Sequence, residues 1–277
     1  MKLTCDKDSL TEGINIVSKA VSSRTTLPVL ECILLNACDG SLTLTASDLE
    51  IGIKTAPIES NVEIDGAVCI EAKLFSEIIR KLNGESVTIS TTENEAVIKC
   101  GFSEFTVMIQ PAEDFPDIPD VQREIGYKIK QSQLRDMINS TIFSVALDES
   151  KPFLTGELME FLNDRTNVVS VDGFRISYKS CEAHNENETR VIVPAKTMRE
   201  ISRILSGDEE SETEIFITDK HILFSINGNT VVSRTIEGDY IKYEQTFTDD
   251  FKTKVLSERA PLIAALERAS LISRDSR

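Results

Sequence analysis

Histidine is scarce in this chain, and the motifs of the common enzyme classes are missing. Only His184 and His221 occur among 277 residues, and neither has a second His or Cys at a zinc-motif spacing. The sequence contains no P-loop, no GxGxxG, no GxSxG and no HExxH. We therefore expect a protein that is not an enzyme, with no catalytic residue, no bound metal and no cofactor.

Long apolar segments are missing as well. No apolar run reaches about 18 residues, the length that suggests a membrane-spanning helix. The N-terminus, MKLTCDKDSL, lacks the apolar stretch of a signal peptide. The six cysteines form no CxxC pair, and most lie in or beside apolar runs, which favours buried thiols over disulfides. These features predict a cytoplasmic protein with no membrane partner.

Charge of one sign dominates the composition. Forty-six acidic residues face thirty Lys and Arg, which gives a net charge of −16. An acidic chain argues at first against nucleic acid as a partner, because phosphates are bound by basic side chains. Net charge is a sum over the whole chain, however, and leaves room for a local basic surface.

The chain contains an internal repeat. Leu10 and Ile14, at helical spacing, match Leu134 and Ile138 at an offset of 124 residues. Further matched pairs keep an offset between 123 and 125: Pro28 and Pro152, Leu30 and Leu154, Asp48 and Asp172, Lys73 and Lys196, Glu77 and Glu200, Gly84 and Gly207, Asp114 and Asp239. Such constancy predicts two copies of one domain.

A third copy begins near the C-terminus. Residues 251–276 resemble the opening strand and first helix of the other two copies, with Leu262 and Leu266 in the places of Leu134 and Ile138. The polar stretches 117–126 and 243–250 mark the boundaries. We predict one domain at 1–120, a second at 127–246 and the start of a truncated third at 250–277.

Each copy has the same order of expected elements. A strand and an amphipathic helix are followed by several alternating strands, a second helix and more strands. Hairpins between the helices, in place of strict strand–helix alternation, are typical of antiparallel sheets. The sequence therefore predicts an α+β fold of repeated domains, each with two helices packed on antiparallel sheets.

The second helix of each copy is basic on one side. At 100° per residue, Arg199 and Arg203 fall within 60° of Lys196, whereas the apolar residues lie opposite. Lys73 and Arg80 repeat this geometry in the first copy. One such helix is more often a solvated face, but two at equivalent positions favour a shared anionic partner. Without base-reading motifs, they suit sequence-independent phosphate contacts.

Six segments then carry a family resemblance. SSRTTLPVL (22–30), ASDLEIGI (46–53), PAEDFPD (111–117), VDGFRISYKS (171–180), VIVPAK (191–196) and EGDYIKY (237–243) together resemble the bacterial β sliding clamp, the β subunit of DNA polymerase III. The similarity runs over the entire chain. It implies DNA-clamp domains of one fold, three per subunit, and a head-to-tail homodimer that forms a ring of six domains with helices lining the hole.

The resemblance also implies a function. A closed ring would encircle duplex DNA without reading its sequence and tether the replicative polymerase by raising its effective concentration. The implied partners are double-stranded DNA, the catalytic subunit of DNA polymerase III, the clamp loader complex, and other clamp-binding replication and repair proteins. The protein would be a non-catalytic processivity factor, classed with the DNA-directed DNA polymerase holoenzyme, a nucleotidyltransferase.

Two sites can be carried over from the family. For DNA, the matching positions are Arg24, Lys73, Arg80, Lys196 and Arg203, and more weakly Arg199 and the loop 148–151. For partner peptides, the family uses a hydrophobic cleft between the second and third domains. Its matching positions are Leu154, Val171, Gly173, Phe174, Arg175, Ile176, Ile241, Gln245 and Thr246.

Parts of the cleft have other interpretations. From the residues alone, Leu154, Val171 and Ile176 are more typical of a core. Phe174 replaces a histidine of the enterobacterial pattern, Ile241 replaces a common proline, and Gln245 replaces a common arginine, which removes a bidentate donor. We expect these changes to alter the shape of the cleft and its motif preference.

Other functional classes stay open at this stage. A repeat-built protein-interaction scaffold could use the same basic helices to bind an acidic protein in place of DNA. A carboxylate-based hydrolase would need paired acids in a pocket, and no constellation recommends one. We also predict that this chain does not close the family's usual ring and binds partner peptides weakly. The third domain supplies both the surface that meets the partner subunit and the other wall of the cleft.

Overall fold

The computed structural model of the chain describes residues 1–22, 25–148, 150–247 and 250–273. Contacts within the chain divide it into two compact units, Met1–Tyr240 and Ile241–Arg277. Among the described residues, no helix is long and apolar enough to cross a membrane.

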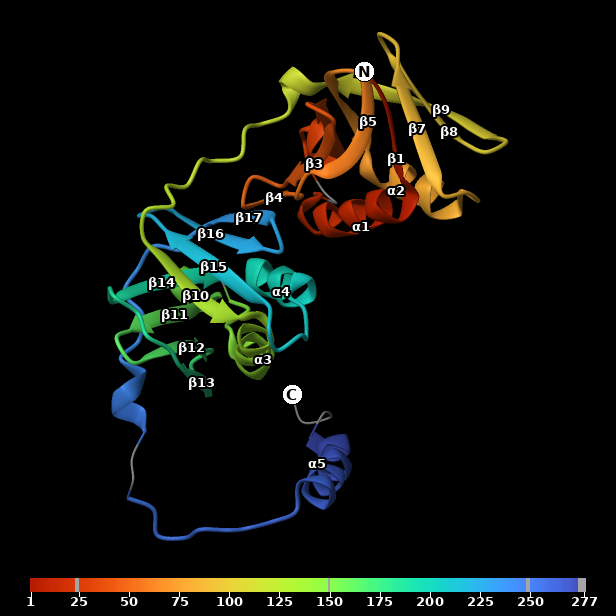
Figure 1. The fold of residues 1–277 in the computed structure, drawn as a ribbon. Helices are drawn as coiled ribbons and strands as arrows, with labels where there is room; N and C mark the ends of the chain where they lie inside the picture. The colour runs from red at the N-terminus through yellow and green to blue at the C-terminus, as the bar shows by residue number, and fades with distance from the viewer. Residues whose placement is uncertain (23–24, 149, 248–249, 274–277) are drawn as a thin grey trace. The chain divides into compact units, whose positions relative to one another are not determined.

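The first repeat runs from β1 to β9 (Figure 1). Its strands and helices are β1 (Lys2–Asp6), α1 (Lys7–Val17), β2 (Cys32–Cys38), β3 (Ser41–Ser47), β4 (Ile51–Lys54), β5 (Ile58–Ile64), β6 (Gly66–Glu71), α2 (Ala72–Lys81), β7 (Ser86–Thr91), β8 (Glu95–Cys100) and β9 (Ser103–Pro111).

The second repeat follows the same order, except that no described strand corresponds to β5. It contains β10 (Gly126–Lys130), α3 (Gln131–Thr141), β11 (Gly156–Leu162), β12 (Arg165–Val171), β13 (Ile176–Glu182), β14 (Thr189–Pro194), α4 (Ala195–Ile204), β15 (Glu212–Ile217), β16 (His221–Ile226) and β17 (Asn229–Arg234). The bounds of β2 and β11 differ by 124 residues, and those of α2 and α4 by 123. The repeat predicted from the matched residue pairs therefore corresponds to matched elements.

The helices form where the sequence provides caps and an apolar face. Asp6 caps α1 by accepting the N–H of Ser9 at 2.8 Å, and the Glu71 carboxylate accepts two N–H groups at the start of α2. In α2 the side chains of Phe75 and Ile78 are buried, and α4 buries Met198 and Ile201 at the equivalent places. The opposed basic and apolar faces are as predicted.

Every strand pair among the described residues is antiparallel, as the α+β prediction requires. One sheet holds β13-β12-β11-β14. The other contains 13 strands in the order β10-β15-β16-β17-β4-β3-β2-β6-β9-β8-β7-β1-β5. This large sheet crosses from one repeat to the other where β17 pairs with β4, from Thr230 opposite Lys54 to Ser233 opposite Ile51.

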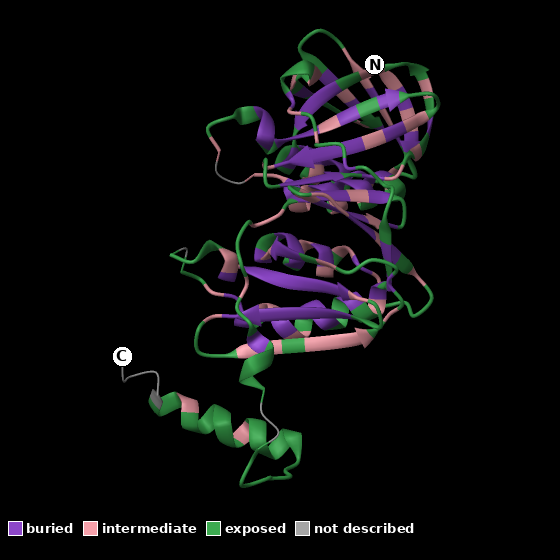
Figure 2. Cartoon of the chain, turned by 90° about the vertical axis from the view of Figure 1, so that its left-hand side faces the viewer, coloured by how far each residue is buried: buried purple, intermediate pink, exposed green. Residues whose placement is uncertain are grey.

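The core of the Met1–Tyr240 unit lies between the sheets and the helices that cover them. Figure 2 shows the buried positions concentrated on the inner strands and on the helix sides that face them. Phe75, Phe161 and Phe224 are among the largest fully buried side chains, and Tyr127 stacks on Phe161 with ring centroids 4.1 Å apart. Burial of such rings supplies much of the apolar area that stabilises a domain.

The Ile241–Arg277 unit contains a 3₁₀ turn, Tyr243–Thr246, and one helix, α5 (Arg259–Ser273). The helix expected there is present, with Leu262 and Leu266 about half exposed. The opening strand expected before it is not formed, and the described residues from 250 to 258 are irregular. A strand needs partners, and β1, its counterpart, pairs with both β5 and β7. The described residues of this unit contain no counterpart of either.

Candidate functional site

The four helices of the Met1–Tyr240 unit carry a charge balance opposite to that of the whole chain. α1 packs against α2, and α3 against α4 (Figure 1). Together they contain eight basic residues, Lys7, Lys73, Arg80, Lys81, Arg135, Lys196, Arg199 and Arg203, against five acidic ones, Asp8, Glu12, Glu77, Asp136 and Glu200. The net charge of −16 therefore comes from the strands and loops of the Met1–Tyr240 unit, because residues 241–277 are themselves slightly positive. The helices form a surface that is basic by comparison.

In the first repeat, Lys73 and Arg80 both lie on the exposed side of α2. The Arg80 guanidinium donates to Ser76 Oγ at 2.7 Å, one turn earlier on the same face. Both basic side chains line a hollow of about 550 Å³, where Glu71 and Glu77 are also present. Lys73 makes no ion pair with any residue that the structure describes. Its ammonium is therefore available to an external anion.

In the second repeat, Arg203 is exposed and held by Glu200 at 2.8 Å, one turn away on α4. Lys19 of the first repeat comes close to both side chains from the 3₁₀ turn Ser18–Ala20. Burial lowers the pKa of Lys19, the positive charge of Arg203 lowers it further, and Glu200 opposes them. Lys19 was not predicted as part of this surface, because its neighbours on α4 lie far away in the sequence.

Lys196 has a partner that the sequence did not predict. Its ammonium forms an ion pair with the carboxylate of Asp48, which follows β3 in the first repeat and is 5% exposed. The other carboxylate oxygen of Asp48 accepts the N–H groups of Glu50 and Ile51 at 3.0 and 2.9 Å. Asp48 is thereby fixed, and it directs Lys196 to the junction between the repeats.

Arg199 interacts electrostatically with a buried carboxyl group, that of Glu157 on β11. Glu157 Oε1 accepts hydrogen bonds from Thr141 at 2.5 Å and Ser170 at 3.0 Å, while Oε2 is buried without a hydrogen-bond partner among the described residues. Burial raises the pKa of Glu157 to about 7, and the two hydrogen bonds and the charge of Arg199 oppose this rise only in part. No local pattern around Glu157 indicated its burial.

Two of the positions predicted to contact DNA lie wholly or partly outside the residues that the structure describes. Arg24 is outside the described residues, and so is residue 149 of the loop 148–151. Within that loop, Asp148 Oδ1 accepts the N–H of Ser150 at 2.9 Å.

The predicted cleft residues separate into buried and exposed groups. Leu154 and Val171 are only 4% and 3% exposed, and Ile176 is half-buried. Phe174 is 99% exposed and follows Gly173, whose φ of +90° turns the chain out of β12. Ile241, Gln245 and Thr246 belong to the C-terminal unit and are exposed there.

Arg175 is the most connected of the exposed cleft residues. Its Nε donates to Asp172 Oδ2 at 2.8 Å and its Nη2 to the carbonyl oxygen of Phe143 at 2.7 Å. The guanidinium carbon lies 5.9 Å from the centre of the Phe143 ring, which is half exposed. Phe143 was missed because it follows α3 in sequence and meets Arg175 only in the fold.

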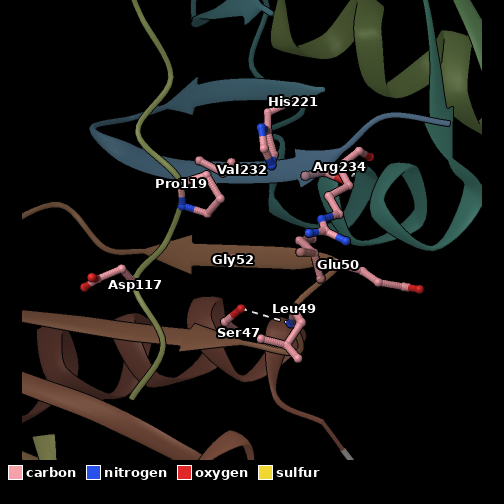
Figure 3. A pocket seen from close by; sticks show the side chains of 11 residues that line it. Ser47, Leu49, Glu50, Gly52, Asp117, Pro119, His221, Val232 and Arg234 are labelled. Atoms are coloured by element: carbon pink, nitrogen blue, oxygen red, sulfur yellow. Dashed lines mark hydrogen bonds between the residues drawn. The ribbon is translucent and has the colours of Figure 1, made fainter. Parts of the chain in front are cut away.

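A cavity of about 240 Å³ lies on the junction between β4 and β17 (Figure 3). Gly52 has no side chain and leaves room there for Ile118. A Cβ atom at position 52 would lie only 2.9 Å from the Ile118 side chain. His221 Nε2 is buried without a hydrogen-bond partner among the described residues, and burial lowers the pKa of His221, helped by Arg234 and Lys220. The imidazole of His221 therefore lies beside the junction, together with Val232 and Arg234.

Comparison with known proteins decides the family. Residues 1–119 match the family model of the DNA polymerase III beta subunit, N-terminal domain, and residues 128–242 match that of its central domain. A beta sliding clamp of Halalkalibacterium halodurans is 31% identical over 289 residues, which cover 100% of this chain and 76% of that protein. The chain belongs to the bacterial β sliding-clamp family.

Solved structures of sliding clamps have the same fold. A DNA polymerase sliding clamp from Bacillus subtilis aligns with a TM-score of 0.95 at 30% identity, over 100% of this chain and 75% of that one. A DNA polymerase III beta subunit from Eubacterium rectale aligns with a TM-score of 0.87 at 42% identity, over 91% of this chain and 69% of that one. The chain is thus a DNA sliding clamp, a processivity factor of DNA replication built from repeated clamp domains.

Proposed function

We propose that this sliding clamp contacts duplex DNA through the exposed basic sides of α2 and α4. The observation that carries the proposal is that Lys73 and Arg80 on α2 occupy the same repeat positions as Lys196 and Arg203 on α4. Both helices bury their opposite, apolar sides and are rigidly held. Basic side chains on rigid helices without base-reading groups suit phosphate contacts that do not depend on sequence.

The contributions of the basic residues should differ. Lys73 and Arg80 have no acidic partner among the described residues, so their full charge faces solvent. Arg203 shares its charge with Glu200, and Arg199 with Glu157. Lys196 is bound to Asp48 and should contribute least. We add Lys19 of the first repeat to the proposed DNA-contact residues. Arg24 stays among these residues on the family resemblance alone.

We propose a second site, for a short linear motif of partner proteins, around the end of β12. The exposed Phe174 and Arg175, together with Phe143, offer an aromatic and cationic surface, and two further predicted positions, Leu154 and Val171, are buried. Ile176 lies at its edge. Ile241, Gln245 and Thr246 remain part of this proposal on the family resemblance alone.

The finer roles follow the family resemblance. We propose domains at 1–120 and 127–246, and the start of a third domain at 250–277. We propose that the protein acts in the cytoplasm. Its proposed partners there are the catalytic subunit of DNA polymerase III, the clamp loader, and further replication and repair proteins. The clamp serves the DNA-directed DNA polymerase without making or breaking a bond itself.

Charge reversal on α2 tests the DNA proposal. We expect Arg80→Glu to weaken binding of a fluorescent duplex at low salt at least about tenfold, because it removes one phosphate contact and adds a repulsive charge. Lys196→Gln should have a smaller effect than Lys73→Gln, because Asp48 already neutralises Lys196. Fluorescence anisotropy at several salt concentrations measures both the affinity and its salt dependence.

The matched control is Lys220→Glu, which reverses an exposed lysine on the turn between β15 and β16, outside the four helices. Its effect should be small. If Lys220→Glu and Arg80→Glu weaken binding equally, DNA responds to net charge alone and the assignment to the helix faces is wrong.

A further inference from the structure

The cavity of Figure 3 lies on one face of the sheet, where the two repeats join. Two rows of residues cross the strands there. In one row, Gly52 of β4 stands between Ser47 of β3 and Val232 of β17. In the next row, Arg234 of β17 is paired with His221 of β16. Residues opposite each other across strands carry their side chains on the same face of a sheet, so these five positions form one continuous floor.

The wall that the first repeat supplies has a counterpart in the cleft proposed for partner peptides. At the offset of 124 residues, Ser47 corresponds to Val171, and residues 49–52 correspond to residues 173–176. The opposite wall comes from β16 and β17 of the second repeat, and both walls belong to the Met1–Tyr240 unit. The junction cavity is therefore a second site with the backbone frame of that cleft, but with different side chains.

Leu49 holds a backbone conformation that its repeat counterpart gives to a glycine. Its φ is +75°, and that of Gly173 is +90°. A leucine is strained at such a φ because its Cβ lies too close to the backbone, whereas a glycine is not. The Leu49 N–H donates to Ser47 Oγ at 3.1 Å, and the half-exposed side chain lines the cavity. Strained residues cluster at binding sites, which favours a role for Leu49 in binding.

Arg234 supplies a positive charge to the cavity. Its guanidinium forms no ion pair with any residue that the structure describes. Two carboxylates line the cavity, those of Glu50 and Asp117, and Figure 3 shows them pointing outward in opposite directions. The cross-strand neighbour His221 brings no negative charge. The guanidinium can therefore take an external carboxylate in two parallel hydrogen bonds.

The linker between the repeats limits the size of a ligand. Ile118 packs over Gly52, and Val121 belongs to the same apolar cluster as Val232. Pro119, between the two linker residues, lines the space that remains, about 240 Å³. At about 30 Å³ for each group of the size of a water molecule, this space holds about eight such groups. It therefore fits a single amino-acid residue and excludes a long extended peptide.

We propose that this cavity binds a carboxylate that carries an apolar chain of the size of one amino-acid residue. Arg234 holds the carboxylate, and the apolar chain lies against Leu49 and Val232. The inference rests on the proposed function in one respect, the correspondence of its wall to the cleft around the end of β12. The required group occurs both at the C-terminus of a peptide and in a free amino-acid derivative.

His221 reports on the cavity, because the chain has only one other histidine, His184. Carbon-edited NMR of the imidazole C–H groups should resolve both histidines, and His221→Gln assigns them. N-acetyl-leucine should shift the His221 signals with a Kd on the order of 1 mM and leave those of His184 unchanged. N-acetyl-leucinamide, which lacks the negative charge, should bind at least about tenfold more weakly. Equal shifts with both probes, or none with either, overturn the proposal.

The pKa of His221 gives a second readout. Burial lowers this pKa in the free protein, and the positive charges of Arg234 and Lys220 lower it further. A carboxylate held by Arg234 offsets part of that charge, so saturating N-acetyl-leucine should raise the pKa of His221. Glu50 and Asp117 are present with and without the probe and do not account for a difference. An NMR titration whose midpoint does not move places the probe elsewhere and overturns the proposal.

Two variants test the charge and the wall separately. Arg234→Gln should weaken N-acetyl-leucine binding at least about tenfold, because it removes the charge that pairs with the carboxylate. Leu49→Gly should weaken binding several-fold with little change in thermal stability, because relief of strain offsets the greater freedom of glycine in the unfolded chain. A leucine with a purely structural role would show unchanged binding and lower stability, which contradicts the proposal.

The matched control is Lys220→Gln. It removes a positive charge from the residue before His221, but Lys220 does not line the cavity. Its binding of N-acetyl-leucine should stay close to that of the parent. If Lys220→Gln and Arg234→Gln weaken binding equally, the probe responds to general charge and the assignment to Arg234 is wrong.

A third probe, N-acetyl-glycyl-glycyl-leucine, separates the two sources of the ligand. Binding as tight as that of N-acetyl-leucine assigns the cavity to the C-terminus of a peptide, and exclusion of this probe assigns it to a free acid. Both results support the site. The titrations contain neither DNA nor a partner motif, so their failure leaves the proposed function standing. A failure of the duplex or motif experiments likewise leaves a positive titration standing.

Discussion

As the pH rises from about 5 to about 8, the protein should lose about 3 kcal/mol of stability relative to its Glu157→Gln variant. The cause is the carboxyl group of Glu157, buried between β11 and the helices α3 and α4, with one oxygen unpartnered among the described residues. The neutral carboxyl group can be buried at this site, whereas burial of the charged carboxylate costs free energy because it removes the hydration of the charge.

The sign follows from the direction of the pKa shift. Burial raises the pKa of Glu157 from its ordinary value of 4.5 to about 7 in the folded protein. The protonated form is therefore favoured by folding, and its stabilising contribution is complete below the unfolded pKa. It disappears as the pH rises through the folded pKa, and it changes no further above that value.

Urea unfolding of parent and variant at several pH values measures this difference. Glutamine keeps an oxygen acceptor for Thr141 and Ser170 but cannot ionise. The control is Glu209→Gln, which changes an exposed glutamate in the loop after α4 and should leave the pH dependence unaltered. A parent and a Glu157→Gln variant with parallel stability curves from about pH 5 to about pH 8 would show that Glu157 is ionised throughout.

Gly156→Ala should destabilise the protein by about 3 kcal/mol, at the upper end for overpacking. Gly156 begins β11 opposite Pro194 of β14. A Cβ there would lie 2.6 Å from the carbonyl oxygen of Val193 and 2.8 Å from Ile192 Cγ2. The first of these is a backbone atom in the same sheet, so relief requires β11 and β14 to separate.

Thermal and urea unfolding compare this variant with Gly207→Ala. The nearest atom to a Cβ at Gly207 is Arg135 Nη1 at 3.4 Å, the end of a flexible side chain. Gly207→Ala should therefore stay within about 0.5 kcal/mol of the parent. Equal stability of the two variants would mean that β11 and β14 adjust freely, contrary to the tight packing of this sheet.

Local patterns in the sequence were sufficient to predict the helices and most strands, and which faces of the helices are buried. The 3.6-residue period of α2 and α4 predicted which residues are buried, and Phe75 and Met198 lie where that period places them. The matched offsets predicted two copies of one fold, because equivalent residues occupy equivalent elements. The basic faces were visible for the same reason.

Contacts between distant segments were not predictable in this way. Asp48 and Lys196 are far apart in sequence, and only the pairing of β4 with β17 brings them together. Glu157 looked like any other acid in an acidic chain, because its burial depends on α3 and α4 covering β11. The opening strand expected within 251–276 is not formed, because a strand depends on partners that a local pattern does not contain.

The central claim is that the protein contacts duplex DNA through basic helix faces, without reading its sequence. The most direct measurement is the binding of two fluorescent duplexes of equal length and unrelated sequence, by anisotropy at several salt concentrations. We predict equal affinities for the two duplexes and the same fall in affinity with salt. A strong preference for one sequence, or no binding to either duplex at low salt, would contradict the account.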